Sequence, residues 1–121
     1  MAYVDGFVLA VPKDRFAEYE TMARLGCEVW TEHGALAYVE AKADDVPYGE
    51  LTSFPRAVQA KEDETVVFSW IVYRDRAHRD EVNARVMADP RMEGAMETAP
   101  FDGRRMIYGG FQGFVERNPH P

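Results

Sequence analysis

One structural unit occurs twice in this chain: an apolar, strand-like run that stops at a turn and continues directly into an amphipathic helix. The first copy predicts a strand over residues 3–11 and a helix over 12–34. The second copy predicts a strand over 66–73 and a helix over 75–89. A further strand candidate follows each copy. The resulting order, βαβ and then βαβ again, predicts an α+β domain in which one sheet carries a helical layer.

The two further strands are expected at residues 36–42 and 105–115. A chain of 121 residues is long enough for such a sheet and its helices around a single core. We therefore expect one domain over residues 1–115. Residues 116–121 contain two prolines and no periodic pattern, which predicts a flexible tail.

The first helix has the clearest pattern. Its apolar or small residues recur at spacings of three and four and share one face: Phe16, Tyr19, Ala23, Gly26, Cys27 and Trp30. Pro12 suits the helix start, and Gly34 can adopt the left-handed conformation that ends a helix. The same pattern places the Cys27 thiol in the core as a buried, unreactive group.

The second helix begins after Asp75, a residue that favours a helix N-terminus. Arg79 and Asp80 are expected on its solvated face, where they would form surface or interface ion pairs. Asp89 followed by proline ends the helix and predicts a short third helix that carries Met92 and Met96, four residues apart.

Both faces of the first and third strands are apolar. In the first strand Tyr3 and Phe7 alternate with Val4 and Val8, and the third strand shows the same two-sided pattern. Two helices can cover only one side of such a sheet, so a second copy of the same sheet is the simplest cover for the other side. We therefore expect a homodimer.

The segment from Asp44 to Asp63 is too long for a simple hairpin loop. A segment of this kind usually lies over a site or an interface. It contains five apolar residues that predict packing against the rest of the molecule: Val46, Tyr48, Leu51, Phe54 and Val58.

Charge and cysteine content restrict the classes of function. The net charge of −7 disfavours nucleic acid as a partner, because nucleic-acid affinity depends on clustered lysine and arginine. The single cysteine excludes an intramolecular disulfide. The start of the chain lacks a basic segment, and its apolar run is too short for a signal core or a membrane span. These features favour a cytoplasmic protein with no membrane association.

Blocks along nearly the whole chain resemble the YbaA-like bacterial family. They are YVDGF at 3–7, GAL at 34–36, DDVP at 44–47, TSFP at 52–55, FSW at 68–70, RD at 79–80, DPRM at 89–92, PFD at 100–102 and RMIYGGF at 105–111. The resemblance implies a ferredoxin-like βαββαβ sandwich with an antiparallel sheet, in the dimeric α/β-barrel superfamily. It implies no catalytic residues, since the family has no established function.

Asp5 is the most informative single residue, because it interrupts an apolar strand face where an unpaired carboxylate would be costly to bury. One interpretation is a proton acceptor or ligand anchor in a pocket beside the sheet, together with Trp70, Arg105 and Tyr108. The other is a structural carboxylate bonded to backbone amides or to an arginine. His78 is a further pocket candidate.

We expect no metal site and no cofactor. The three histidines, His33, His78 and His120, are widely separated and lack the paired spacing of metal ligands. His33 fits the last turn of the first helix, where a cation is favoured, and His120 lies in the tail. The chain has no glycine-rich phosphate loop, nucleophile elbow or HExxH motif.

Two functional hypotheses remain open. The first is a non-catalytic homodimeric binding or stress-related protein, in which Asp5 and the aromatic residues are structural. The second is a cofactor-independent, oxygenase-like enzyme that acts on a small molecule in a pocket beside the sheet, by analogy with relatives in the superfamily.

Overall fold

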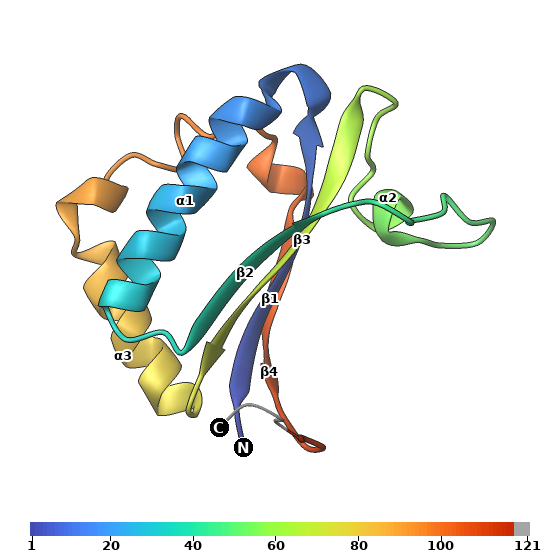
Figure 1. The fold of residues 1–121 in the computed structure, drawn as a ribbon. Helices are drawn as coiled ribbons and strands as arrows, with labels where there is room; N and C mark the ends of the chain where they lie inside the picture. The colour runs from blue at the N-terminus through green and yellow to red at the C-terminus, as the bar shows by residue number, and fades with distance from the viewer. Residues whose placement is uncertain (118–121) are drawn as a thin grey trace.

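The computed structural model describes residues 1–117, which form a four-stranded antiparallel sheet with two long helices on one face (Figure 1). The elements are, in order, β1 (Tyr3–Pro12), the 3-10 turn η1 (Lys13–Arg15), α1 (Phe16–Glu32), β2 (Ala37–Lys42), α2 (Phe54–Ala57), β3 (Glu64–Tyr73), α3 (Arg76–Met87), the 3-10 turns η2 (Pro90–Met92) and η3 (Gly103–Arg105), and β4 (Ile107–Gln112). The strand order is β2-β3-β1-β4, which places the two long strands in the centre. The predicted ferredoxin-like βαββαβ fold is confirmed.

Local signals fix the helix ends. The Asp75 carboxylate accepts a hydrogen bond from the His78 backbone N–H at 2.8 Å, so α3 begins where the sequence predicts. After α1 the chain turns at Gly34, whose φ of 114° is a left-handed conformation. The predicted short third helix begins after Asp89, whose side chain caps it, but it is a 3-10 helix that ends at Met92 and does not reach Met96. Only one 3-10 turn forms at η2, because Gly94 turns the chain away at a φ of 71°.

The last strand is also shorter than predicted. Arg105 belongs to η3, and β4 ends at Gln112 rather than at residue 115. The β4 strand pairs with β1 only from Ile107, which lies opposite Val8. Six of the ten residues of β1 therefore have β4 beside them, and the remaining part of β1 borders η3 and the segment before it.

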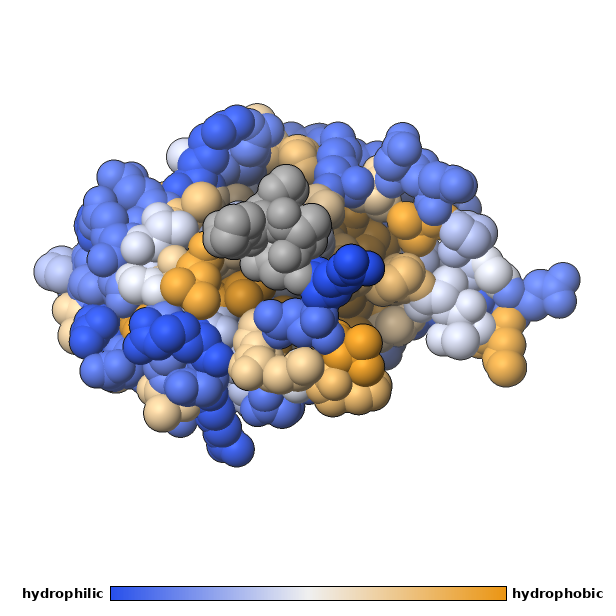
Figure 2. Space-filling model, turned by 60° about the horizontal axis from the view of Figure 1, so that its bottom comes forward, coloured by the Kyte–Doolittle hydropathy of each residue, from blue (hydrophilic) through white to orange (hydrophobic). Residues whose placement is uncertain are grey.

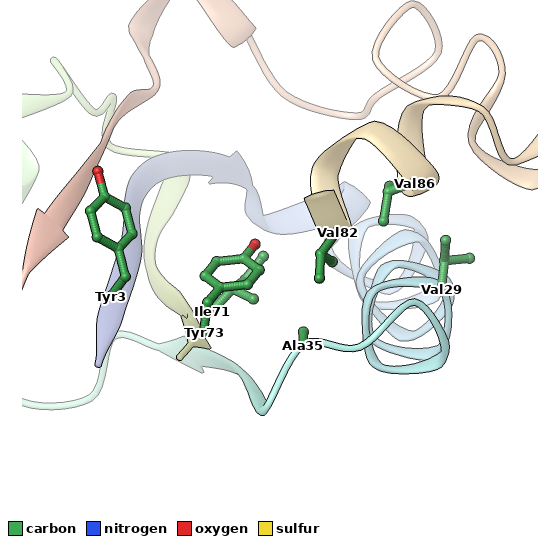
Figure 3. Close-up of a cluster of buried hydrophobic side chains, with 7 residues drawn as sticks. All are labelled: Tyr3, Val29, Ala35, Ile71, Tyr73, Val82 and Val86. Atoms are coloured by element: carbon green, nitrogen blue, oxygen red, sulfur yellow. The ribbon is translucent and has the colours of Figure 1, made fainter. Parts of the chain in front are cut away.

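The main core lies between the sheet and the helices (Figure 3). Tyr73 and Ile71 project from β3 toward Val82 and Val86 on α3, and Val29 of α1 completes the contact. A second cluster at the other end of the sheet joins Leu9, Val11, Tyr19 and Val67. Burial of these apolar side chains holds α1 and α3 against one face of the sheet.

The other face of the sheet is open and apolar. Side chains at alternate positions of all four strands form it; its larger members are Val4, Val8, Val39, Phe68, Trp70, Val72, Ile107 and Phe111. Phe68, Ile107 and Phe111 are 41 %, 46 % and 63 % exposed. Figure 2, which views one end of the molecule, shows patches of hydrophobic atoms bordered by hydrophilic residues. The helices leave this face uncovered, as the two-sided strand pattern predicts.

Residues 43–63, which we call the arm, extend from the sheet on its open side (Figure 1). Ser53 caps the short helix α2, and the Arg56 guanidinium lies 3.9 Å from the centre of the Tyr48 ring. Val58 is buried against the open face of the sheet, next to Ala10 and Val66. The predicted packing is correct for Val58, and Phe54, although 46 % exposed, lies against Phe68 of the sheet at 5.7 Å between ring centres. Val46 is half-buried. The prediction is wrong for Tyr48 and Leu51, which are 60 % and 93 % exposed.

No helix in the described part of the chain is long and apolar enough to cross a membrane.

Candidate functional site

A cavity of about 690 Å³ lies between the sheet and the helices. Its floor is the helix-facing side of the sheet, and its walls come from α1, α3 and the segment that follows α3. The lining is mostly apolar, with a small number of polar side chains among the aromatic and aliphatic ones. This is the usual composition of a site for a small molecule.

Strand pairing sets the order of the side chains on the floor. One row across the sheet is Glu40, Ser69, Phe7 and Tyr108. The next row is Tyr38, Ile71, Asp5 and Gly110. The polar residues of these rows are therefore neighbours on one face, although they come from distant parts of the sequence.

Asp5 forms a buried ion pair. Its residue is 5 % exposed, and its Oδ1 accepts a hydrogen bond from Arg79 Nη1 at 2.8 Å. Arg79 reaches it from α3 and also bonds Asp80 through Nε at 2.8 Å. Burial raises the pKa of Asp5, while the Arg79 charge and hydrogen bonding from Tyr73, Asn83 and Arg79 act in the opposite direction. The arginine partner agrees with one of the two interpretations that the sequence leaves open.

Arg79 itself differs from its prediction. The sequence places it on the solvated side of α3, but its side chain is only 18 % exposed and lines the cavity. Its guanidinium lies 5.0 Å from the centre of the Tyr3 ring. The buried carboxylate of Asp5 draws it inward, because an uncompensated charge there would be costly.

Asn83 organises the wall beside this pair. Its Oδ1 accepts hydrogen bonds from the Trp30 indole N–H at 3.1 Å and from the Tyr73 hydroxyl at 3.3 Å. Burial and the nearby Asp5 charge raise the pKa of Tyr73. Asn83 therefore ties α1, α3 and β3 together next to Asp5.

Glu40 is the centre of a second polar group. The Tyr19 hydroxyl donates to its Oε1 at 2.5 Å, and the Tyr38 hydroxyl donates to its Oε2 at 2.8 Å. Burial raises the pKa of both tyrosines, and the Glu40 charge adds to this effect. Both phenols are consequently neutral hydrogen-bond donors at physiological pH.

Every methionine after Met1 lines the cavity: Met22, Met87, Met92, Met96 and Met106. Four of the five belong to the end of α3 and the segment between α3 and β4. This segment is fastened to α1 by Arg91, which bonds Glu32 at 2.6 Å, and by His33, which lies 2.9 Å from Asp89. Methionine side chains are flexible and polarizable, so this wall can adapt to the shape of an occupant.

The structure brings only two of the five predicted pocket residues to the cavity. Asp5 lies on its floor, and Tyr108 lies at its edge, 73 % exposed, with its ring stacked on Phe7 at 6.3 Å. Trp70 is on the open face of the sheet, where it contacts Phe68. Trp70 lies between Ser69 and Ile71, which face the cavity, and successive side chains of a strand point to opposite faces of the sheet.

His78 and Arg105 have structural contacts elsewhere. His78 is 5 % exposed, and its Nδ1 accepts a hydrogen bond from the Arg74 backbone N–H at 3.0 Å. Arg105 forms a two-point ion pair with Glu64, at 2.8 and 2.7 Å, which fastens η3 to the start of β3. Neither side chain lines the cavity.

Sequence reasoning missed Glu40, Ser69 and Asn83. Glu40 interrupts β2 as Asp5 interrupts β1, and this is the signal that could have indicated it. The signal is weak, however, because β2 is an edge strand, where charged residues are common. Ser69 and Asn83 are ordinary residues for their elements. The pairing of β3 with β1 and β2 shows where Ser69 lies, and the packing of α3 against α1 and β3 shows where Asn83 lies.

The other chemistry-bearing residues stay apart from the cavity floor. Cys27 is half-buried rather than buried, because it lies at the edge of the apolar face of α1. Within residues 1–117 no three His, Cys, Asp or Glu side chains are grouped so that they could hold a metal ion. His120 and the end of the predicted tail lie outside the described residues.

The four-stranded antiparallel sheet, with helices on one face, defines a protein of the ferredoxin-like α+β fold. The chain belongs to the family described as "Protein of unknown function (DUF1428)", whose model matches residues 2–103. It is 51 % identical to the uncharacterized protein YbaA of Escherichia coli K12 over 116 residues, which cover 96 % of this chain and 99 % of YbaA. The resemblance seen in the sequence is thus confirmed.

Two solved structures share the fold at low sequence identity. SnoaB of Streptomyces nogalater, a cofactor-independent oxygenase, has a TM-score of 0.59 and 14 % identity, with 98 % of each chain covered. A dimeric ferredoxin-like protein from an uncultured marine organism has a TM-score of 0.53 and 12 % identity, with 98 % of this chain and 99 % of that chain covered. At these identities the likeness shows the fold alone.

Proposed function

We propose that this protein is a homodimer that binds a small, largely apolar molecule in the cavity between the sheet and the helices. The observation that carries the proposal is the cavity itself: about 690 Å³, with apolar walls and a few fixed polar groups. A volume of this size suits an occupant of drug-like dimensions. The buried Asp5–Arg79 pair and the five methionines give the site a rigid floor and an adaptable wall.

The open sheet face supports the dimer. It exposes large apolar side chains on β2, β3 and β4, and a surface of this kind usually marks an interface. The arm extends on the same side of the sheet (Figure 1). Its apolar residues Tyr48, Leu51 and Phe54 are exposed. A second copy that places its own sheet on this face would cover both groups at once, and a structural neighbour is described as dimeric.

A catalytic role for the same cavity is the second candidate. It is favoured by Asp5, a buried carboxyl group with a raised pKa on the cavity floor, which is the kind of group that transfers protons in enzymes. Mass spectrometry of a ligand recovered after incubation distinguishes the two. An unchanged ligand supports binding alone, whereas a product that is lost in an Asp5→Asn variant supports catalysis.

Cavity binding can be tested with Nile red, a neutral dye whose fluorescence increases in apolar surroundings. Ala23 lines the cavity from α1, so an Ala23→Phe change fills part of the space. We expect it to weaken dye binding by about tenfold or more, equivalent to a loss of roughly 1.4 kcal/mol. Ala17→Phe is the matched control, because Ala17 is exposed on the same helix. Equal dye binding by both variants and the unmodified protein would contradict the proposal.

A further inference from the structure

The Glu40 end of the cavity offers hydrogen-bond acceptors and almost no free donors. The hydroxyl protons of Tyr19 and Tyr38 are both used on the Glu40 carboxylate, one on each oxygen. The carboxylate still has unused lone pairs, and so does each phenol oxygen. An occupant must therefore bring its own N–H or O–H groups to this end.

Ser69 adds an unused polar group at the same place. It lies directly opposite Glu40 in the pairing of β2 with β3, and it lines the cavity. The residue is 6 % exposed, yet its hydroxyl has no hydrogen-bond partner among residues 1–117. Every fully buried side-chain oxygen and nitrogen of these residues has a partner, so the Ser69 oxygen is open to the cavity, where it can donate to or accept from a polar group of an occupant.

The negative charges of the cavity outnumber its positive charges. Asp5 is neutralised by Arg79, and the Arg79 guanidinium is already engaged by Asp5 and Asp80. Within the described chain, no Lys, Arg or His nitrogen lies within the 4.0 Å of an ion pair from Glu40. Lys42, next on the same face of β2, has its Nζ 4.3 Å from the centre of the Phe16 ring. The cavity therefore has one uncompensated negative charge and no free cation for an anionic ligand.

The apolar walls also suit a cation. Trp30, Phe101 and the two tyrosines present aromatic rings to the cavity, and aromatic faces attract a positively charged group. The methionine wall provides polarizable contacts for the rest of the molecule. We propose that the occupant is a hydrophobic amine, whose protonated nitrogen binds Glu40 and Ser69 while its apolar part lies among the methionines. This rests on the proposed function of the cavity.

Three probes of the same shape and different charge test this assignment: 2-(1-naphthyl)ethylamine, 1-ethylnaphthalene and 1-naphthylacetate. Isothermal titration calorimetry of the full chain measures each affinity at neutral pH. We expect the amine to bind at least tenfold more tightly than the neutral hydrocarbon. We expect no detectable binding of the carboxylate, which would face Glu40 without a cation to receive it.

Glu40→Gln tests the residue responsible. It retains the shape of the side chain and an oxygen that can accept from a tyrosine, but it removes the charge. The amine should then bind no better than the hydrocarbon, and hydrocarbon affinity should stay unchanged, which also shows that the variant is folded. Ser69→Ala should weaken binding of the amine several-fold and leave the affinity for the hydrocarbon unchanged. Glu62→Gln, at an exposed turn outside the cavity, is the charge-matched control and should change neither affinity.

The outcomes separate the two proposals. Equal or tighter binding of the carboxylate, or an amine preference that survives Glu40→Gln, would overturn the amine assignment and leave the binding cavity intact. Both proposals would be overturned if none of the three probes binds and if Ala23→Phe does not weaken Nile red binding.

Discussion

Asp5 and Glu40 show what a single residue reveals before and after the chain folds. Both are carboxylates on the cavity face of the sheet. Asp5 is visible in the sequence because it interrupts a central, apolar strand, and its need for a partner follows from the cost of burying a charge. The identity of that partner does not follow, since Arg79 is 74 positions away and is brought close only by the packing of α3.

Removal of one partner of the Asp5–Arg79 pair should cost more stability than removal of both. Arg79→Met leaves the Asp5 carboxylate buried without its cation, and we expect it to reduce the free energy of unfolding by about 2–3 kcal/mol. This figure is below the range for fully buried pairs, since Arg79 keeps some exposure. Adding Asp5→Asn to Arg79→Met should recover part of the loss. Urea denaturation of the two single variants and the double variant measures the coupling, and strictly additive losses would show that the pair is not coupled.

At the scale of elements, the sequence predicts the repeated βαβ units, the C-terminal end of α1 and both ends of α3 well, because their periodicity and capping residues are local. The start of α1 lies at Phe16 rather than at Pro12, because the 3-10 turn η1 comes first. The sequence predicts less of the segment between α3 and β4, where Asp89 caps one 3-10 turn rather than a helix that reaches Met96. The conformation there is set by distant ion pairs: Arg91 and His33 link the segment to α1, and Arg105 links η3 to Glu64 of β3. Such contacts have no counterpart in local sequence patterns. The cavity wall of methionines was for this reason not predictable as a unit.

Acid should loosen this segment. Hydrogen bonds from the Arg104 side chain and backbone lower the pKa of Asp102 from 3.8 to about 2. A carboxyl whose folded pKa is depressed stabilises the fold above its unfolded pKa, and this contribution is lost as the pH falls from about 4 to about 2. Hydrogen bonds from Arg91 and His33 also lower the pKa of Asp89. The pKa of Asp5 is raised, so this group has the opposite effect on the pH dependence of stability.

The thermal unfolding midpoint measured from pH 6 to pH 2 would test this contribution. Asp102→Asn should lower the midpoint near neutral pH and make its decrease below about pH 4 less steep. Asp45→Asn provides the control, because Asp45 is exposed on the arm and takes part in no hydrogen bond or ion pair within residues 1–117. An acid limb of identical slope in all three proteins would show that Asp102 does not contribute.

At the scale of the whole molecule, the two faces of the sheet have different roles. One face is covered by helices and contains the cavity, and the other is apolar and open. Alternation along β3 assigns Ser69 to the first face and Phe68 and Trp70 to the second. The two-sided strand pattern predicted an uncovered face, but it could not say which residues belong to which face, because strand pairing with β1 and β2 decides this.

The dimer should depend on the open face. Phe68 is in the central strand β3 and contacts Phe54 of the arm at 5.7 Å between ring centres. Phe68→Glu introduces a charge that would be buried on both sides of a two-fold interface, so we expect a monomer. Light scattering should give a mass of two 13.8 kDa chains for the unmodified protein and of one chain for the variant. Phe114→Glu, at a position 87 % exposed beyond β4, should remain dimeric. A monomeric unmodified protein at micromolar concentration would contradict the proposed assembly.

The most direct test of the binding cavity is a methyl NMR titration of protein labelled with carbon-13 at its methionine methyl groups. All five methionines after Met1 line the cavity, so each of them reports on its contents. Addition of 2-(1-naphthyl)ethylamine should shift most of these five signals together and saturate at one molecule per chain. The same titration of the Ala23→Phe variant should give much smaller shifts at equal concentration. Unchanged methionine signals at saturating amine and at saturating Nile red would contradict the account that this cavity is a binding site.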